Sequence, residues 1–569
     1  MKCFYLKHKN ILFIIIFLGL ILRLWSIKQN LPYNYYGDES YLIYHSLKFG
    51  TGDLNPHWFI WPTLFQYLLF FFFSIFYLLG FALSWFKGPA DFLYLYFKDP
   101  TIFFLIGRIT SAIFGTTSIY LVYTLTKKIY DKNTGLISAF IFSFLPLTVE
   151  YSHYAVTDTP VVFMILLSFV SIMNIFLYTR LKDYISSGIL SGLAIGTKYP
   201  AGILILPIIL AHLFSLKQRS FKAIFSSKLI FCFFSIFLGF FLSTPFAILD
   251  FSKFFLDIKG QVLCAKMGWF GWEKTNPYIY HLNQNLKNTL GFPLLFFSLI
   301  SLIYIIIQRE KKDLILISFP IIYFLLIGWN SNPYPRFMLP VLPFFAIFSG
   351  KLLSDLKDWK INKGDKGADF LFFCLLVFLF FNPIYSSIRV NLSFSLPNTM
   401  TLAKEWVEKN IPKGSKILLN EYGPPLIQSP KKNRIESESK PKELLRYGYH
   451  RQRDLFYKIK ERVSAEGINY ELTYIPNPIG YLENESGYEW LMKRMDEAIN
   501  DYQNKYDFVI ISDALLYKII GYPREYLPKR YFKLRDFYKE ILNNYQPIKV
   551  FSPQKNAIIG PTIRIYKLR

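Results

Sequence analysis

Cysteine and acidic residues are both scarce in this sequence. Its 569 residues include four scattered cysteines, Cys3, Cys232, Cys264 and Cys374. Their spacing argues against a disulfide framework and against a cysteine-based metal site. Asp and Glu together number 39, against 64 Lys and Arg, and charged residues make up only 18% of the chain. So low a charge content is not typical of a soluble globular protein.

Apolar and aromatic residues take the place of the missing charges. Hydrophobic residues make up 53% of the chain, with 59 Phe and 41 Tyr. Long apolar runs recur through the first 390 residues, which predicts a polytopic helical membrane protein. The net charge of +25 is then explained by basic cytoplasmic loops and contact with anionic lipids. We expect membrane lipids, and no nucleic acid, among its partners.

The distribution of basic residues predicts the orientation of the spans. Lys2, Lys7 and Lys9 precede the first apolar run, which lacks a small-residue cleavage site and is interpreted as a retained helix. Basic segments then recur at 127–132, 180–182, 217–222, 309–312 and 351–366. If all of these are cytoplasmic, the chain crosses the membrane about eleven times. The apolar segment 61–86 fits this count only as a re-entrant or juxtamembrane helix.

The composition changes after Pro397. Residues 1–396 are predicted to form the membrane domain, and residues 397–569, which are rich in Lys, Glu, Tyr and Asn, a soluble α/β domain. A helix is expected at 401–409, with strands at 416–420, 508–512, 550–552 and 563–566. Eleven crossings place this domain outside the cell, at the plasma (inner) membrane.

The same topology gathers a set of polar residues on the outer face. The set comprises Asp38, Glu39, His57, Arg108, His153, Asp158, Lys198, Tyr334 and Arg336. Each has a structural alternative: the aspartates can cap helices, and the cations can anchor the spans at lipid headgroups. Because ionisable groups are costly at membrane depth, their accumulation on one face indicates a functional site.

These residues suit group transfer from a lipid-linked donor. A carboxylate can accept a proton from an attacking hydroxyl or amine. Lysine and arginine can hold and neutralise a leaving phosphate. A transporter or flippase for a lipid-linked sugar is the alternative, although transporters place such charges near the midplane and often contain repeats. A scaffold that recruits a partner through its outer domain is a third possibility.

Several short motifs resemble one known group of enzymes. Besides Asp38 and Glu39, they are Asn55–Leu64 (NPHWFIWPTL), Arg108–Gly115 (RITSAIFG), Tyr123–Tyr130 (YTLTKKIY), Tyr151–Asp158 (YSHYAVTD), Gly196–Pro200 (GTKYP) and Arg336–Pro343 (RFMLPVLP). In this order they resemble protein O-mannosyltransferases and lipid A aminoarabinose transferases, glycosyltransferases of the GT-C superfamily. The resemblance covers roughly residues 10–390.

The resemblance implies a fold, a reaction and roles for individual residues. The GT-C fold combines transmembrane and juxtamembrane helices. The implied reaction transfers a sugar, with inversion, from a polyprenyl phosphate to a protein, lipid or glycan. Asp38 matches the catalytic base with Glu39 beside it, Asp158 the acid of the second outer loop, and Arg336 a ligand of the donor phosphate. Trp-Pro-Thr-Leu replaces the mannosyltransferase Pro-Pro-Leu pattern at 61–64, which leaves the sugar and the acceptor open. A divalent metal held by Asp38, Glu39 and His57 is a further possibility.

Overall fold

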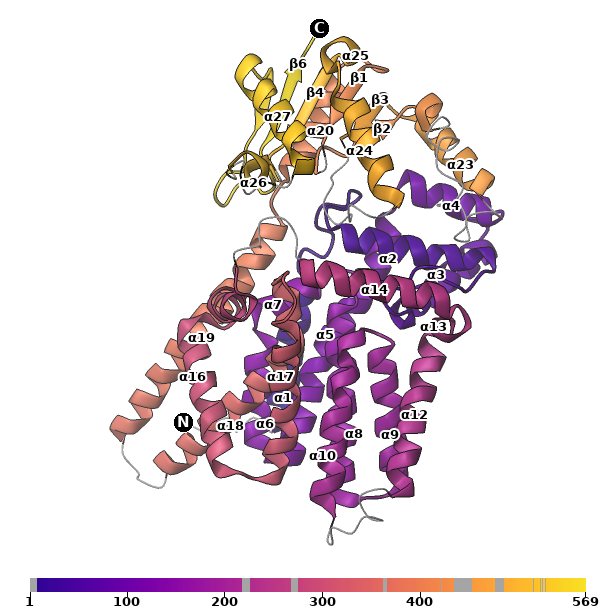
Figure 1. Ribbon diagram of the computed structural model, residues 1–569. Coiled ribbons are helices and arrows are strands. Elements are labelled where there is room, and N and C mark those ends of the chain that lie inside the picture. Colours follow the sequence, from indigo (N-terminus) through magenta and orange to yellow (C-terminus); the bar gives the residue numbers. More distant parts are fainter. Residues whose placement is uncertain are drawn as a thin grey trace.

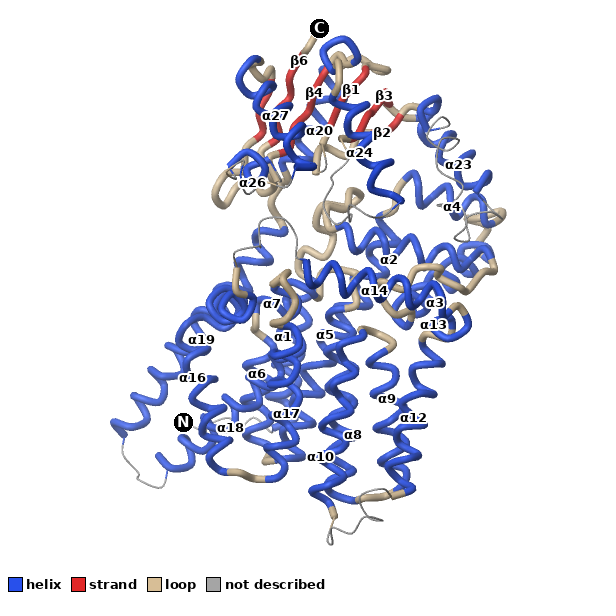
Figure 2. The backbone as a smooth tube through the Cα atoms, in the orientation of Figure 1, coloured by secondary structure: helices blue, strands red, loops and turns tan. Residues whose placement is uncertain are grey.

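The protein consists of a helical bundle with a mixed β-sheet at one end (Figure 1). The computed structural model describes residues 8–216, 226–267, 275–361, 366–420, 422–433, 453–475 and 486–569, except residues 515, 522, 524, 526 and 528. The predicted cytoplasmic segment 217–222 lies outside the described residues. Figure 2 shows that helices make up the whole bundle and that the strands gather at the end farthest from the N-terminus.

Helices form at all eleven predicted crossing segments. They are α1 (His8–Leu24), α5 (Thr101–Ile129), α6 (Lys132–Ser143) with α7 (Pro146–Tyr151), α8 (Asp158–Tyr178), α9 (Leu181–Ile195), α10 (Ile205–Ser215), α12 (Ser227–Ser243), α16 (Lys287–Gln308), α17 (Lys311–Ile327), α18 (Leu342–Ile361) and α19 (Lys366–Phe394). Many large apolar side chains on the bundle's outer surface are exposed, among them Phe13, Phe234 and Phe378. Such a surface is stable only in contact with lipid.

Six helical segments of the described chain are long and apolar enough to cross a membrane. They are 64–82, 101–129, 158–178, 277–308, 335–359 and 370–394. The protein is therefore an integral, multi-pass helical membrane protein. The number of eleven crossings and the side on which each loop lies stay predictions.

Four helices lie across the end of the bundle that is nearest the sheet (Figure 1). They are α2 (Gly37–Lys48), α3 (Leu64–Ala82), α4 (Pro89–Lys98) and α14 (Phe251–Met267). Aromatic contacts join α3 to the start of α5, where Phe73 and Phe76 pack on Phe103 with ring centroids 5.6 and 6.1 Å apart. α3 therefore packs against the beginning of α5. Whether it crosses a membrane stays a prediction.

The sheet has six strands in the order β2-β3-β1-β4-β6-β5. The strands are β1 (Lys416–Leu419), β2 (Ile427–Gln428), β3 (Asn469–Tyr474), β4 (Phe508–Ser512), β5 (Lys549–Phe551) and β6 (Ile563–Lys567). The first four run parallel, and β6 pairs antiparallel with β4 and β5. The four predicted strands are present, and sequence patterns missed β2 and β3. Parallel strands of this kind are expected to be covered on both faces.

Successive side chains of the central strands enter two separate cores. Ile417 and Ile510 pack with α20 (Thr399–Asn410) on one face, whereas Leu418 and Val509 belong to the core on the other. The second core includes α24 (Ser486–Ile499), α25 (Tyr502–Lys505), α26 (Leu516–Gly521) and α27 (Phe532–Asn544). The alternation follows from the two-residue period of a strand. The result is an α/β arrangement. The predicted boundary at residue 397, which lies between α19 and α20, stays a prediction.

The sheet region contacts the loop that leads into α2. The hydroxyl of Tyr35 lies 2.7 Å from Thr401 Oγ1 on α20. Farther out, the ring of Phe97 on α4 packs on Phe456 of α23 (Arg453–Glu466), with centroids 4.7 Å apart. These contacts place α20 and α23 over the helices that cross the end of the bundle.

Candidate active site

Asp38 and Glu39 lie in the first turn of α2. The N-cap residue of this helix is Tyr36, whose side chain makes no capping hydrogen bond. The capping role considered for Asp38 is therefore wrong, because the helix already begins at Gly37, one residue before it. Both carboxylates still lie where the partial positive charge of a helix start stabilises an anion.

Asp38 forms an ion pair with Arg336, which is 298 positions away in the sequence. The same guanidinium nitrogen donates a hydrogen bond of 2.8 Å to the hydroxyl of Tyr36. Both charged side chains remain partly exposed, Asp38 by 27% and Arg336 by 20%. The pair is thus accessible to a ligand, and the carboxylate already has a cation beside it.

A second ion pair lies close by. Lys198 Nζ donates a hydrogen bond of 2.5 Å to Asp158, whose position in the first turn of α8 matches that of Asp38 in α2. The ring of Phe337 lies between the two pairs, with its centroid 5.4 Å from Lys198 Nζ and 5.8 Å from the Arg336 guanidinium carbon. Both cations are therefore held against one aromatic ring.

Tyrosine rings complete the surroundings of Asp38. Tyr36 stacks on Tyr154 with centroids 4.4 Å apart and meets Tyr151 edge-on at 6.3 Å. Burial raises the pKa of Tyr36, which keeps its hydroxyl protonated at neutral pH. On the other side, Tyr334 lies 5.2 Å from the Arg336 guanidinium carbon, and burial raises its pKa too. Tyr36 and Phe337 were not predicted as site residues. Tyr36 lies two positions before Asp38, and Phe337 directly follows Arg336.

Glu39 has surroundings quite different from those of Asp38. Its side chain is fully buried and accepts hydrogen bonds of 2.7 and 2.9 Å from Arg108. The backbone N–H of Ala155 donates a further bond of 2.9 Å to it. Arg108 also donates to the carbonyl oxygens of Ile27 and Gln29, at 3.0 and 2.9 Å. This network fastens α2 to α5 and to the loop before α8.

The two predicted histidines lie in separate places. His153 is buried, and its ring nitrogens lie 2.8 Å from the Val149 carbonyl oxygen and 2.7 Å from that of Trp25. Burial lowers the pKa of His153. His57 instead contacts Asp53 at 2.9 Å and Asp250 at 3.6 Å. His153 thus joins the end of α7 to the chain after α1, whereas His57 joins two loops.

The three residues considered as metal ligands do not converge. Glu39 is engaged by Arg108, Asp38 by Arg336, and His57 by Asp53 and Asp250. Within the described part of the chain, no group of three or more His, Cys, Asp or Glu residues could hold a metal ion. The metal hypothesis therefore gains no support from the placement of these side chains.

Comparison with known proteins identifies the relatives of this arrangement. Residues 104–243 match the dolichyl-phosphate-mannose-protein mannosyltransferase family. The archaeal oligosaccharyltransferase AglB from Archaeoglobus fulgidus, solved with an inhibitory peptide and a dolichol-phosphate, superposes with a TM-score of 0.51 at 12% identity. That match covers 90% of this chain and 71% of AglB.

Two further solved structures have lower scores. ArnT from Cupriavidus metallidurans bound to undecaprenyl phosphate has a TM-score of 0.46 at 11% identity, with 97% of each chain covered. The Pmt1-Pmt2 protein O-mannosyltransferase complex of S. cerevisiae has a TM-score of 0.31 at 18% identity, with 44% of this chain and 35% of that chain covered. No curated protein sequence matches the chain. The mannosyltransferase match and the AglB fold confirm the resemblance to GT-C membrane glycosyltransferases.

Proposed function

We propose that this protein is an inverting glycosyltransferase that uses a polyprenyl-phosphate sugar at the outer face of the membrane, with Asp38 as the catalytic base. The acceptor is a protein, lipid or glycan. The observation that carries the proposal is the partly exposed ion pair between Asp38 and Arg336 at the end of the bundle nearest the sheet. The mannosyltransferase family match and the dolichol-phosphate bound to AglB support the class of donor.

The two ion pairs supply a carboxylate that can act as the base and cations that can bind the leaving phosphate. An acceptor hydroxyl or amine attacks the anomeric carbon, the bond from that carbon to the phosphate oxygen breaks, and the acceptor proton passes to Asp38. Polyprenyl phosphate leaves with the additional negative charge. Arg336 and Lys198 stabilise that charge, because cations in a partly desolvated site act most strongly where charge develops.

Binding of the donor prepares the base. Without donor, Arg336 neutralises Asp38. A donor phosphate is a better bidentate partner for a guanidinium than one carboxylate oxygen is. When the phosphate engages Arg336, the Asp38 carboxylate becomes free to accept a hydrogen bond from the acceptor. Phe337 contacts both Arg336 and Lys198, and in this proposal the two cations share the donor phosphate.

The remaining predicted residues have positioning roles in this proposal. Glu39 and Arg108 hold the start of α2, so Glu39 supports the base and does not itself meet the substrate. The C-terminal α/β region, residues 397–569, lies outside the cell in this account. Its contact with the loop before α2, through Tyr35 and Thr401, supports a role for this region in admitting the acceptor.

Lipid-linked sugars and surface glycans test the proposed function in cells. Removal of the protein should cause a polyprenyl-phosphate sugar to accumulate and one sugar to disappear from a surface protein, lipid or glycan. Complementation with the wild-type chain should reverse both changes, whereas complementation with D38N should not. If both pools are unchanged after removal, the protein is not a glycosyltransferase of this class.

A further inference from the structure

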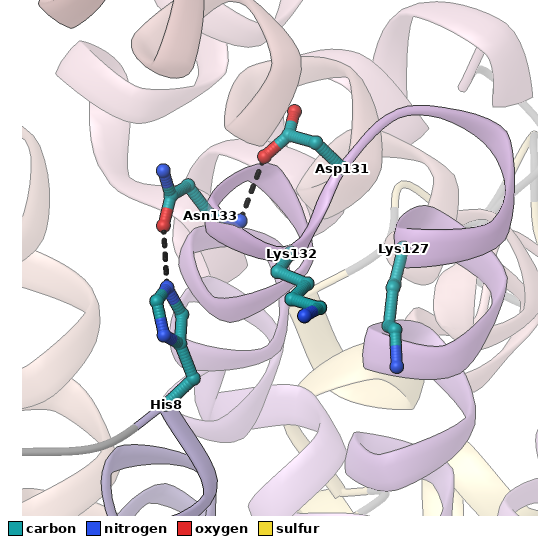
Figure 3. A pocket seen from close by; sticks show the side chains of 5 residues that line it. All are labelled: His8, Lys127, Asp131, Lys132 and Asn133. Carbon is teal, nitrogen blue, oxygen red and sulfur yellow. Dashed lines mark hydrogen bonds between the residues drawn. The ribbon is translucent and has the colours of Figure 1, made fainter.

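A hollow of about 490 Å³ lies where α5 ends and α6 begins (Figure 3). It is lined by His8 at the start of α1, Lys127 in the last turn of α5, and Asp131, Lys132 and Asn133 at the start of α6. None of these residues belongs to the proposed active site. Three ends of helices therefore meet around a polar hollow.

The acidic residue of this hollow is already engaged by its own helix. One Asp131 oxygen accepts hydrogen bonds from the N–H groups of Asn133 and Thr134, at 2.7 and 3.0 Å, and the other accepts the Thr134 hydroxyl. The Asp131 pKa lies below its usual value: burial acts to raise it, and the hydrogen bonds from Thr134 and Asn133 outweigh that effect. Asp131 is thus a helix cap, which leaves its charge compensated locally.

The two lysines have no carboxylate partner within the described part of the chain. Lys127 lies over the ring of Tyr123, with Nζ 5.7 Å from the centroid, and both lysine side chains are exposed. Figure 3 shows the two amino groups extending to the same side, away from the Asp131 carboxylate. His8 Nε2 lies 2.9 Å from Asn133 Oδ1, and this contact holds the start of α1 against the start of α6. The hollow can therefore accept an anion between two cations.

An exposed apolar stripe runs from the hollow along the bundle. On α5, Ile109, Ile113 and Tyr120 are exposed and follow the face that ends at Lys127. A free anion would have no use for these surfaces, whereas the acyl chains of a phospholipid would cover them.

We propose that this hollow binds the phosphate headgroup of an anionic phospholipid, with the acyl chains lying along α5. The phosphate is held by Lys127 and Lys132. Lysine is suited to this role as a strongly hydrated point charge on a flexible stem. The lipid would stabilise the junction of α1, α5 and α6 at the end of the bundle far from the sugar-transfer site, so the proposal is independent of the proposed function.

The test uses the purified full-length protein in a mild neutral detergent and titrates it with phosphatidylglycerol. Phosphatidylcholine and inorganic phosphate serve as comparison probes, and bound lipid is counted by native mass spectrometry. We expect saturable binding of phosphatidylglycerol, and about 30-fold weaker binding in K127Q/K132Q, since each lysine near an anionic lipid contributes about fivefold. The matched control K182Q/K311Q alters two other exposed lysines and should bind as the wild type does, and K127R/K132R should retain binding.

Three results would overturn the proposal. One is equal binding by K127Q/K132Q and wild type, and another is an equal loss in K182Q/K311Q. The third is displacement of the lipid by millimolar inorganic phosphate, which would assign the hollow to a free anion. Thermal unfolding of all three double variants, compared without lipid, identifies any loss of binding that is caused by misfolding. If K127Q/K132Q misfolds, the charge-preserving K127R/K132R decides the matter, because loss of lipid by that folded variant would also contradict the headgroup site.

Discussion

Glu39 and Arg108 form an ion pair in which both side chains are almost completely buried, with exposed fractions of 0% and 2%. Removal of one partner would leave the other charge buried and unpaired, which typically costs about 3–5 kcal/mol. We therefore expect E39A and R108A to lower the thermal unfolding temperature of the detergent-purified protein markedly. R108K keeps the charge but loses the bidentate geometry. Its unfolding temperature should therefore lie between those of the alanine variants and the wild type.

This prediction separates a positioning role for Glu39 from a catalytic one. In a positioning role, E39Q loses stability and activity together, and the activity that remains at low temperature keeps the wild-type KM for the donor. An E39Q enzyme with wild-type unfolding behaviour and a large loss of kcat would instead show that Glu39 acts in the chemical step.

Phe337 is predicted to matter through the two cations that it contacts. Loss of a cation–π contact costs about 0.5–2 kcal/mol, so F337L should raise the KM for the polyprenyl-phosphate donor several-fold to tens of fold. F337Y keeps the ring and should remain close to wild type. F345L, a change at a partly buried phenylalanine eight residues farther along the chain, is the matched control. An equal effect of F345L would show that the F337L result comes from a packing defect.

The roles of Lys198 and Asp158 can be distinguished by how much each substitution raises the KM for the donor. If Lys198 holds the leaving phosphate, K198Q removes a ligand of the donor and should raise its KM and lower kcat/KM by about 10–100-fold. D158N removes only the partner that positions Lys198 and should have a smaller effect on KM. Steady-state kinetics with varied donor concentration measures both. A larger rise in KM for D158N than for K198Q would reverse the two roles.

The sequence allowed much of the fold to be predicted, because apolar length and basic loops are local signals. Each predicted crossing segment is helical, and the strands around residues 416–420 and 508–512 lie next to each other in the sheet. β3 was missed although its sequence, Asn469–Tyr474, alternates polar and apolar residues as a half-buried strand does. β2 has only two residues, too few for any periodicity.

The sequence allowed several residues of the candidate site to be predicted, but not which of them form ion pairs with each other. Asp38, Asp158, Lys198 and Arg336 were chosen from their common side of the membrane, and they do form two adjacent ion pairs. Neighbouring positions gave no warning that Glu39 would turn inward to Arg108, since the direction of a side chain in the first helical turn depends on how α2 packs. The contact between Asp38 and Arg336 joins residues 298 positions apart, and no local pattern encodes it.

The most direct test of the account is sugar transfer by D38N in membranes supplied with polyprenyl-phosphate sugars. The substitution keeps the shape of the side chain and removes its capacity to accept a proton, so we expect transfer to fall by about 10²–10⁴-fold. Folding and donor binding should persist. D99N alters another exposed carboxylate, which among the described residues accepts a hydrogen bond from the Thr101 N–H alone, and it should remain active. A D38N enzyme that transfers sugar at the wild-type rate would contradict the assignment of Asp38 as the base.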